Sequence, residues 1–363
     1  MDGFIEWDCP VDLAVLEEAF RVLQERQLLV GAFDNFQDKT FGLYTYSLQQ
    51  ALHGTELFIL IDRNLLSFVK EFALGKCLAA RNRIDLGALM VVAMVHDISF
   101  EPCIALYEYA DSHDNLAVSR DLQIFHHADN LPLRIYVDLL FQRIDRLPAP
   151  RRFINGQDSV PNEYDFTVPL KTWNFNYPLL LKIAQLERTQ LKPEERMVAY
   201  LDWMWSEYIF SGPATAFGIM FLSPGRCGHK KMIKDLFCSD RSRRSAGLRN
   251  ACWDLCLMQE WMKRLRQQDM ENRLWLLASA DKALSHAACR LTMSNSLDEQ
   301  QLTEAKKGNF CEAWGQDRGM KLYLHYRLLL DTQNSSRRMA NSPQFSREYC
   351  DQLSKRIEDE ILS

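Results

Sequence analysis

Apolar residues recur along most of this chain at the three- and four-residue spacing that places them on one face of a helix. In residues 10–29, leucines and a phenylalanine at this spacing form one apolar stripe. The pattern predicts helices at 10–29, 65–74, 84–95, 116–127, 131–144, 179–186, 194–209, 245–266, 282–291, 320–330 and 346–361, and another that begins at Pro102. Residues 151–178 are rich in Asn, Asp and aromatics, and we expect an irregular surface segment there.

Two short segments interrupt the helical pattern with continuous apolar runs. Residues 56–61 and 273–280 form these runs, which are typical of strands covered on both faces of a parallel sheet. Each run leads directly into an aspartate, Asp62 or Asp281, and helical spacing resumes at once. Because sites form at the carboxyl ends of parallel strands, we expect the two aspartates to converge on one crevice. The sequence therefore predicts an α/β fold with a short parallel sheet.

Length and composition place the chain among globular proteins. Its 363 residues, 47% of them hydrophobic, can bury a substantial core and suggest about two domains. The acidic start lacks the pattern of a signal peptide, and the most apolar runs, 86–95 and 214–222, are shorter than the roughly 20 residues that cross a bilayer. We therefore expect a cytoplasmic protein without a membrane segment.

The ten cysteines are scattered through apolar contexts, and in a cytosolic chain they behave as small hydrophobic residues. Cys227, His229 and Cys238 are conceivable zinc ligands, but no CxxC pair supports such a site.

The net charge of −5 conceals a basic segment between residues 226 and 249. This segment is either a solvated loop and helix face or a surface that contacts the phosphates of a nucleic acid. The residues that we predict to bind substrate there are Lys230, Lys231, Arg241, Arg243 and Arg244.

The two strand-terminal aspartates also allow two interpretations. Either Asp62 or Asp281 can simply cap the helix that follows it. Alternatively, carboxylates that lie close together repel one another unless a cation neutralises them, and oxygen-rich clusters suit Mg²⁺ or Mn²⁺. Such ions activate water and stabilise the charge that develops on a phosphodiester.

Four short patches resemble the motifs of PIN-domain nucleases in the family's order. Residues 61–66 (IDRNLL) resemble the opening strand motif, 105–108 (ALYE) the helix-borne Glu, 250–254 (NACWD) the helix-borne Asp, and 276–284 (LLASADKAL) the last strand motif. The resemblance implies a PIN-like three-layer core and an endoribonuclease that hydrolyses RNA, or sometimes DNA. The acids that it implies as metal ligands and catalytic residues are Asp62, Glu108, Asp254 and Asp281.

The resemblance also implies a discontinuous core, because far more residues separate Glu108 from Asp254 than a compact PIN domain needs. We predict a helical flank at 1–50, a core at 51–115 and 225–295, a helical insertion at 116–224 and a C-terminal helical extension at 296–363. The insertion or the extension is a possible binding surface for a protein partner. Two further polar residues are predicted to bind substrate, Asn64 beside the first aspartate and Asn250 one helical turn before Asp254.

Two other functions remain open on the sequence. Residues 120–126 resemble the Arg-x(4 to 6)-His motif of metal-independent HEPN ribonucleases, which would use Arg120 to hold the phosphate and His126 as acid or base. A non-catalytic interaction protein on a PIN-like fold is the second alternative. Activity in excess chelator would favour the HEPN-like alternative.

Overall fold

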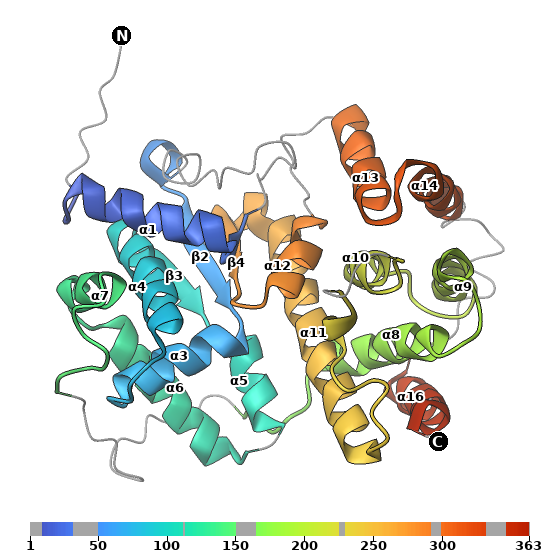
Figure 1. Ribbon diagram of the computed structural model, residues 1–363, viewed down its shortest axis with the longest axis horizontal. Helices are drawn as coiled ribbons and strands as arrows, with labels where there is room; N and C mark the ends of the chain where they lie inside the picture. Colours follow the sequence, from blue (N-terminus) through green and yellow to red (C-terminus); the bar gives the residue numbers. More distant parts are fainter. Residues whose placement is uncertain are drawn as a thin grey trace. The chain divides into compact units, whose positions relative to one another are not determined.

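The computed structural model describes residues 9–31, 50–111, 113–149, 165–224, 229–291, 299–331 and 346–362 (Figure 1). The contacts divide the chain into two compact units. Unit 1 comprises Met1–Val168 and Gln267–Ser285, and unit 2 comprises Pro169–Arg266 and His286–Ser363. The fold is mixed α/β and mostly helical, with one small sheet that lies in unit 1.

The sheet has four strands in the order β1-β4-β2-β3. β2 (Glu56–Ile61) lies parallel to both β3 (Ile98–Glu101) and β4 (Arg273–Ala278). β1 (Leu29–Val30) pairs with β4 in the antiparallel direction. The expected parallel sheet is therefore present in three strands, and β1 makes the whole sheet mixed. The two edge strands, β1 and β3, are additions to the two strands predicted from the sequence.

The central strands are covered on both faces, as their continuous apolar runs predict. Ile59 and Ile61 of β2 are fully buried, and so is Leu276 of β4. Phe58 pairs with Trp275 across the two strands, and their rings stack with centroids 4.7 Å apart. Stacked cross-strand aromatics of this kind help to fix the register of a sheet.

Two groups of helices build the rest of unit 1 around these strands (Figure 1). α4 (Ala80–Val95) packs against α1 and α7, while α3 packs against α5 and α6. Gly87 allows the close approach of α4 and α7, because a Cβ there would lie 2.5 Å from the backbone nitrogen of Leu140. The bounds of the other helices are α1 Leu13–Arg26, α3 Arg63–Ala73, α5 Cys103–Ala110, α6 Asn115–Asp129, α7 Leu133–Leu140 and α12 Lys282–Cys289.

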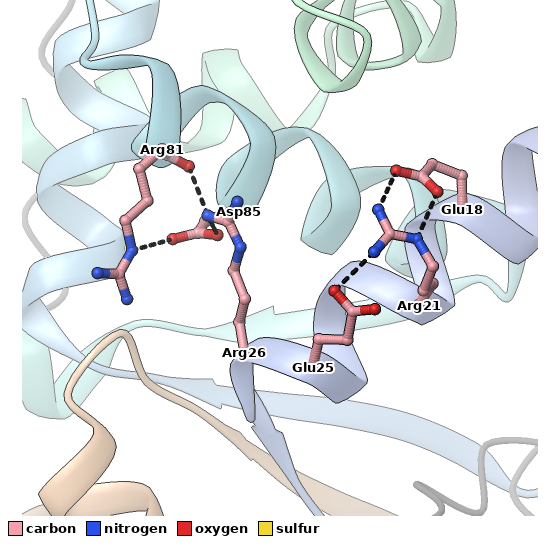
Figure 2. A network of polar contacts seen from close by, with 6 residues as sticks. All are labelled: Glu18, Arg21, Glu25, Arg26, Arg81 and Asp85. Atoms are coloured by element: carbon pink, nitrogen blue, oxygen red, sulfur yellow. Dashed lines mark hydrogen bonds and ion pairs between the residues drawn. The ribbon is translucent and has the colours of Figure 1, made fainter.

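A buried carboxylate joins α1 to α4 (Figure 2). Asp85 of α4 is 2% exposed, and its Oδ1 accepts a hydrogen bond of 2.5 Å from Nη1 of Arg26. Arg26 also donates to the carbonyl oxygen of Arg81, whose own guanidinium lies 3.7 Å from Asp85. By contrast, Arg21 on the exposed side of α1 pairs with Glu25 in solvent. The buried network therefore fixes the end of α1, directly before β1 enters the sheet.

All the regular secondary structure described in unit 2 is helical. α8 packs against α16, α9 and α10, and α14 packs against α13 and α9. α10 is almost entirely buried, as expected of the apolar run 214–222. The bounds are α8 Lys171–Glu187, α9 Pro193–Ser206, α10 Gly212–Phe221, the 3₁₀ turn His229–Met232, α11 Arg241–Glu271, α13 Glu299–Trp314, α14 Gln316–Asp331 and α16 Arg347–Leu362.

One expectation about these elements is corrected by the structure. The irregular segment predicted at 151–178 is wrong for its last residues, because α8 begins at Lys171 and contains Pro178. The two units also group the chain differently from the predicted domain bounds. α6 and α7, which begin the predicted insertion at 116–224, pack on α3 and α4 of unit 1, whereas α8 to α10 belong to unit 2.

Candidate functional site

Asp62 and Asp281 follow neighbouring parallel strands at the same edge of the sheet. Ile61 at the end of β2 pairs with Ala278 at the end of β4. The backbone nitrogen of Asp62 extends this ladder with a hydrogen bond of 3.0 Å to the carbonyl oxygen of Ala278. Asp281 lies three residues beyond Ala278. The carboxyl ends of β2 and β4 thus bring the two aspartates to one place, as the strand-Asp-helix pattern predicts.

Both aspartates cap the helices that follow them. Oδ1 of Asp62 accepts a hydrogen bond of 2.8 Å from the backbone nitrogen of Leu65 in the first turn of α3. Oδ1 of Asp281 accepts from the backbone nitrogens of Ala283 and Leu284 in α12, at 2.8 and 3.3 Å. Both residues therefore act as helix caps, whatever further role they have. These capping bonds use only Oδ1 of each carboxylate.

Ser279 bridges the two aspartates. Its buried hydroxyl donates to Oδ2 of Asp62 at 2.5 Å and accepts from the backbone nitrogen of Asp281 at 2.9 Å. Its own backbone nitrogen donates to the carbonyl oxygen of Leu28, beside β1. Sequence reasoning missed this residue, although a lone hydroxyl inside the apolar run 273–280 is a signal that could have found it.

The surroundings of Asp62 disfavour its negative charge. Burial raises the pKa of Asp62 to about 6, and the carboxylate of Asp281 adds to the shift. Hydrogen bonds from Leu65, Ser279 and Asn64 oppose the shift without cancelling it. The amide of Asn64, an exposed residue, lies 3.4 Å from Oδ2 of Asp62. Asp62 therefore binds a proton more readily than an ordinary aspartate does, unless a cation offsets its charge.

Glu108 of α5 is the third acid of this region. Its Oε1 accepts a hydrogen bond of 3.0 Å from Nη1 of Arg63, and its side chain is 11% exposed. Burial raises the pKa of Glu108 to about 7; Arg63 opposes the shift, and the charges of Asp62 and Asp111 add to it. Asp62 therefore interacts electrostatically with both Asp281 and Glu108. We call Asp62, Glu108 and Asp281 the carboxylate cluster.

Contacts between α3 and α5 hold Glu108 in position. The hydroxyl of Tyr109, the next residue, lies 2.6 Å from the hydroxyl of Ser67. The guanidinium of Arg63 and the ammonium of Lys70 both lie over the Tyr109 ring, at 4.8 and 4.2 Å from its centroid. Such cation–π contacts add to the packing of the two helices. Lys70 is fixed in turn by an ion pair with Asp121 of α6.

The fourth predicted acid, Asp254, lies in the other unit. Asp254 and Asn250 are half-buried residues of α11 within unit 2, whereas the carboxylate cluster lies in unit 1. Trp253 and Leu255 beside Asp254 are buried. A role for Asp254 and Asn250 at the same site therefore stays a prediction.

The basic segment is largely engaged in contacts within unit 2. Arg243 donates two hydrogen bonds to Asp235, and Arg241 forms an exposed ion pair with Asp359. Arg244 is buried, and it donates to the carbonyl oxygen of Leu362 at 2.7 Å. The burial of Arg244 indicates a structural role, because little of its side chain is exposed for the predicted contact with phosphate. Lys231 is exposed, and the side chain of Lys230 lies outside the described part of the chain.

Other candidate sites gain little from the fold. Arg120 and His126 both lie on α6, but residues six apart are about 120° apart around a helix, so they face different directions. Cys227, a conceivable zinc ligand, lies outside the described residues.

Among the residues that the structure describes, no group of three or more His, Cys, Asp or Glu is placed to hold a metal ion. No helix in these ranges is long and apolar enough to cross a membrane.

Comparisons with known proteins add no relative. A scan against protein-family models finds no match, and searches of the curated proteins and of the solved structures find none either. The functional argument therefore rests on the geometry of the carboxylate cluster.

Proposed function

We propose that unit 1 is a divalent-metal-dependent nuclease module that hydrolyses phosphodiester bonds, with RNA favoured over DNA. One observation carries the proposal: Asp62 and Asp281 follow neighbouring parallel strands, and the hydroxyl of Ser279 joins them. The PIN-like three-layer core belongs to this proposal, as do the preference for RNA and the cytoplasmic location. The resemblance of the four short motifs to those of PIN-domain nucleases supports the three-layer core and the preference for RNA.

The electrostatics of the carboxylate cluster support a cation at this edge of the sheet. Burial raises the pKa of both Asp62 and Glu108; the charge of Asp281 adds to the shift of Asp62, and the charge of Asp62 adds to that of Glu108. A bound divalent cation would reverse this balance, because it stabilises the charged form of every carboxylate around it. The kinds of donor also suit the ion, since carboxylate, hydroxyl and amide oxygens are the ligands that Mg²⁺ and Mn²⁺ prefer.

In this proposal Asp62, Glu108 and Asp281 would hold the cation. The structure does not place these three acids as a ready metal site, so binding would have to draw their carboxylates together. Capping and metal binding are compatible, because Oδ1 of Asp62 accepts one capping bond and keeps a second lone pair, and the capping bonds of Asp281 use only its Oδ1. Ser279 holds Asp62 and the Asp281 backbone in register, and Asn64 at the exposed rim orients water or phosphate. When bound, the ion supplies a more acidic water and stabilises the charge on the phosphate. Overall, hydrolysis adds one water across the ester: a P–O bond to the water oxygen forms, the ester P–O bond breaks, and the leaving oxygen takes up a proton from the water.

The test is a nuclease assay on the purified full-length protein. Labelled single-stranded RNA and DNA are incubated with the protein in Mg²⁺, in Mn²⁺ and in excess chelator. The proposal predicts cleavage with either metal, faster on RNA, and none in chelator. Cleavage that persists in chelator would favour the HEPN-like alternative with Arg120 and His126. No cleavage, together with no binding of Mn²⁺, would favour an interaction protein.

A further inference from the structure

Arg63 occupies an unusual position, one residue after Asp62 and at the first position of α3. A cation at the start of a helix is disfavoured by the helix dipole, which places positive charge at that end. The helix alone therefore gives no reason for an arginine there. Its surroundings are more informative, because Arg63 contacts the carboxylate cluster directly, through Glu108.

The side chain of Arg63 extends from this cluster to the protein surface. It is 38% exposed, whereas its partner Glu108 is 11% exposed. Its guanidinium lies over the ring of Tyr109, which limits the directions in which it can point. A guanidinium has five N–H donors, more than the two that a single carboxylate can accept in a forked pair. Arg63 can therefore face both the acids and a ligand at the surface.

Lys70 provides a contrast on the same helix. It also lies over the Tyr109 ring, but it is paired with Asp121, and both of these side chains are mostly buried. Its position is explained by the packing of α3 on α5 and α6. Arg63 differs because its partner Glu108 is one of the acids proposed to hold the metal, so two cations compete for the same carboxylate. A metal ion bound by Glu108 would offset the negative charge of that carboxylate and would weaken its attraction to Arg63.

We propose that Arg63 contacts the phosphate of the bound nucleic acid, giving up its pair with Glu108 to do so. This inference rests on the proposed function. The planar fork of arginine matches two phosphate oxygens, and a cation here offsets the repulsion that the carboxylate cluster exerts on a polyanion. Arg63 is thus assigned to substrate binding rather than to the positioning of Glu108 alone.

The experiment compares R63Q and R63K with the parent protein and with R21Q. Arg21 is a matched control, because it is an exposed arginine of unit 1 whose ion pairs with Glu18 and Glu25 lie along α1 (Figure 2). Binding of a short labelled single-stranded RNA of mixed sequence is titrated with salt in Ca²⁺. Binding of Mn²⁺ without RNA is measured by calorimetry, and circular dichroism checks the fold.

For R63Q we expect RNA binding about tenfold weaker, the size of one lost charge-assisted hydrogen bond. The log-log salt slope should fall by about 0.7, the value for one phosphate contact on a single strand. R63K should keep the parent's slope with intermediate affinity, because it keeps the charge and loses the fork. Mn²⁺ affinity should not fall in either variant, because Arg63 competes with the metal for Glu108 instead of helping to bind it, and R21Q should match the parent throughout.

Two results would overturn the inference, and they are distinguishable. If R63Q lowers Mn²⁺ affinity while the salt slope of RNA binding stays unchanged, Arg63 only positions Glu108 and the proposed function survives. If the parent neither binds Mn²⁺ nor cleaves RNA, the proposed function fails and this inference fails with it. If R63Q does not fold, R63K provides the test by itself. RNA affinity and a salt slope both equal to those of the parent would show that Arg63 makes no forked contact with phosphate.

Discussion

The hydroxyl of Ser279 lies 2.5 Å from Oδ2 of Asp62 and accepts a hydrogen bond from the Asp281 backbone, so one small side chain connects the ends of β4 and β2. Ser279→Ala leaves the buried carboxylate and the Asp281 amide each short of a partner. We expect this variant to lower the free energy of unfolding by about 1 to 3 kcal/mol, the cost of unsatisfied buried groups. Urea denaturation measures the change. Stability equal to that of the parent would mean that the bridge is unimportant for the fold.

The pKa of Asp62 predicts how its removal affects stability. The folded protein holds this carboxyl at a pKa of about 6 against an ordinary value of 3.8, so between these values the folded state binds more protons than the unfolded state. The parent's free energy of unfolding therefore loses this contribution as pH rises through that window. Asp62→Asn keeps the capping oxygen and has no charge to bury.

In metal-free buffer we expect Asp62→Asn to gain stability relative to the parent as pH rises from about 4 to above 6, by on the order of 2 kcal/mol. Asp12→Asn is the control, because Asp12 caps α1 from an exposed position by accepting from the Ala14 backbone. Urea denaturation at several pH values measures the difference in the free energy of unfolding between Asp62→Asn and the parent. A constant difference between Asp62→Asn and the parent would show that burial does not raise the pKa of Asp62.

Metal binding should depend on pH for the same reason. With the pKa of Asp62 near 6 and that of Glu108 near 7, protons compete with the cation for both carboxylates. We expect the affinity for Mn²⁺ to rise with pH across this range, and binding to release protons. Calorimetry in two buffers of different ionisation enthalpy counts those protons. Affinity that does not change with pH would place the ion elsewhere.

The buried carboxylate of Asp85 should matter more than the exposed ion pairs beside it (Figure 2). Asp85→Ala leaves Arg26 without the partner that joins α1 to α4, and we expect a loss of about 2 to 3 kcal/mol of stability. Glu25→Ala removes an exposed pair with Arg21 and should cost at most about 1 kcal/mol. Equal losses in the two variants would contradict this order.

The strands show how far sequence reasoning reaches. β2 and β4 are predictable because both faces are buried, which produces the continuous apolar runs. β3 mixes apolar and polar residues over only four positions, and β1 has two residues, so neither carries a pattern of its own. The first half of α8 is not predictable in this way, because Pro normally interrupts a helix, whereas Pro178 lies inside α8.

The residues of the site differ in the same way: some carry a local sequence pattern, and others depend on partners far along the chain. Asp62 and Asp281 are predictable because a strand followed by an aspartate and a helix is a local pattern. The roles of Ser279 and Arg63 depend on partners far along the chain, Asp62 for the first and Glu108 for the second. Burial of Arg244 against the end of α16 is likewise a tertiary contact, and no local charge pattern distinguishes it from Arg243.

The most direct test of the metal-dependent nuclease is the rate of RNA cleavage by Asp281→Asn in Mg²⁺. Asparagine keeps the oxygen that accepts from Ala283 and Leu284, so the start of α12 is preserved while the charge is lost. Glu25→Gln, an exposed carboxylate on α1, is the control and should cleave as fast as the parent. We predict a rate at least about 100-fold lower for Asp281→Asn, since even residues behind a metal ligand change activity by 10- to 100-fold. A folded Asp281→Asn protein that cleaves at the parent's rate would contradict the assignment of metal catalysis to the carboxylate cluster.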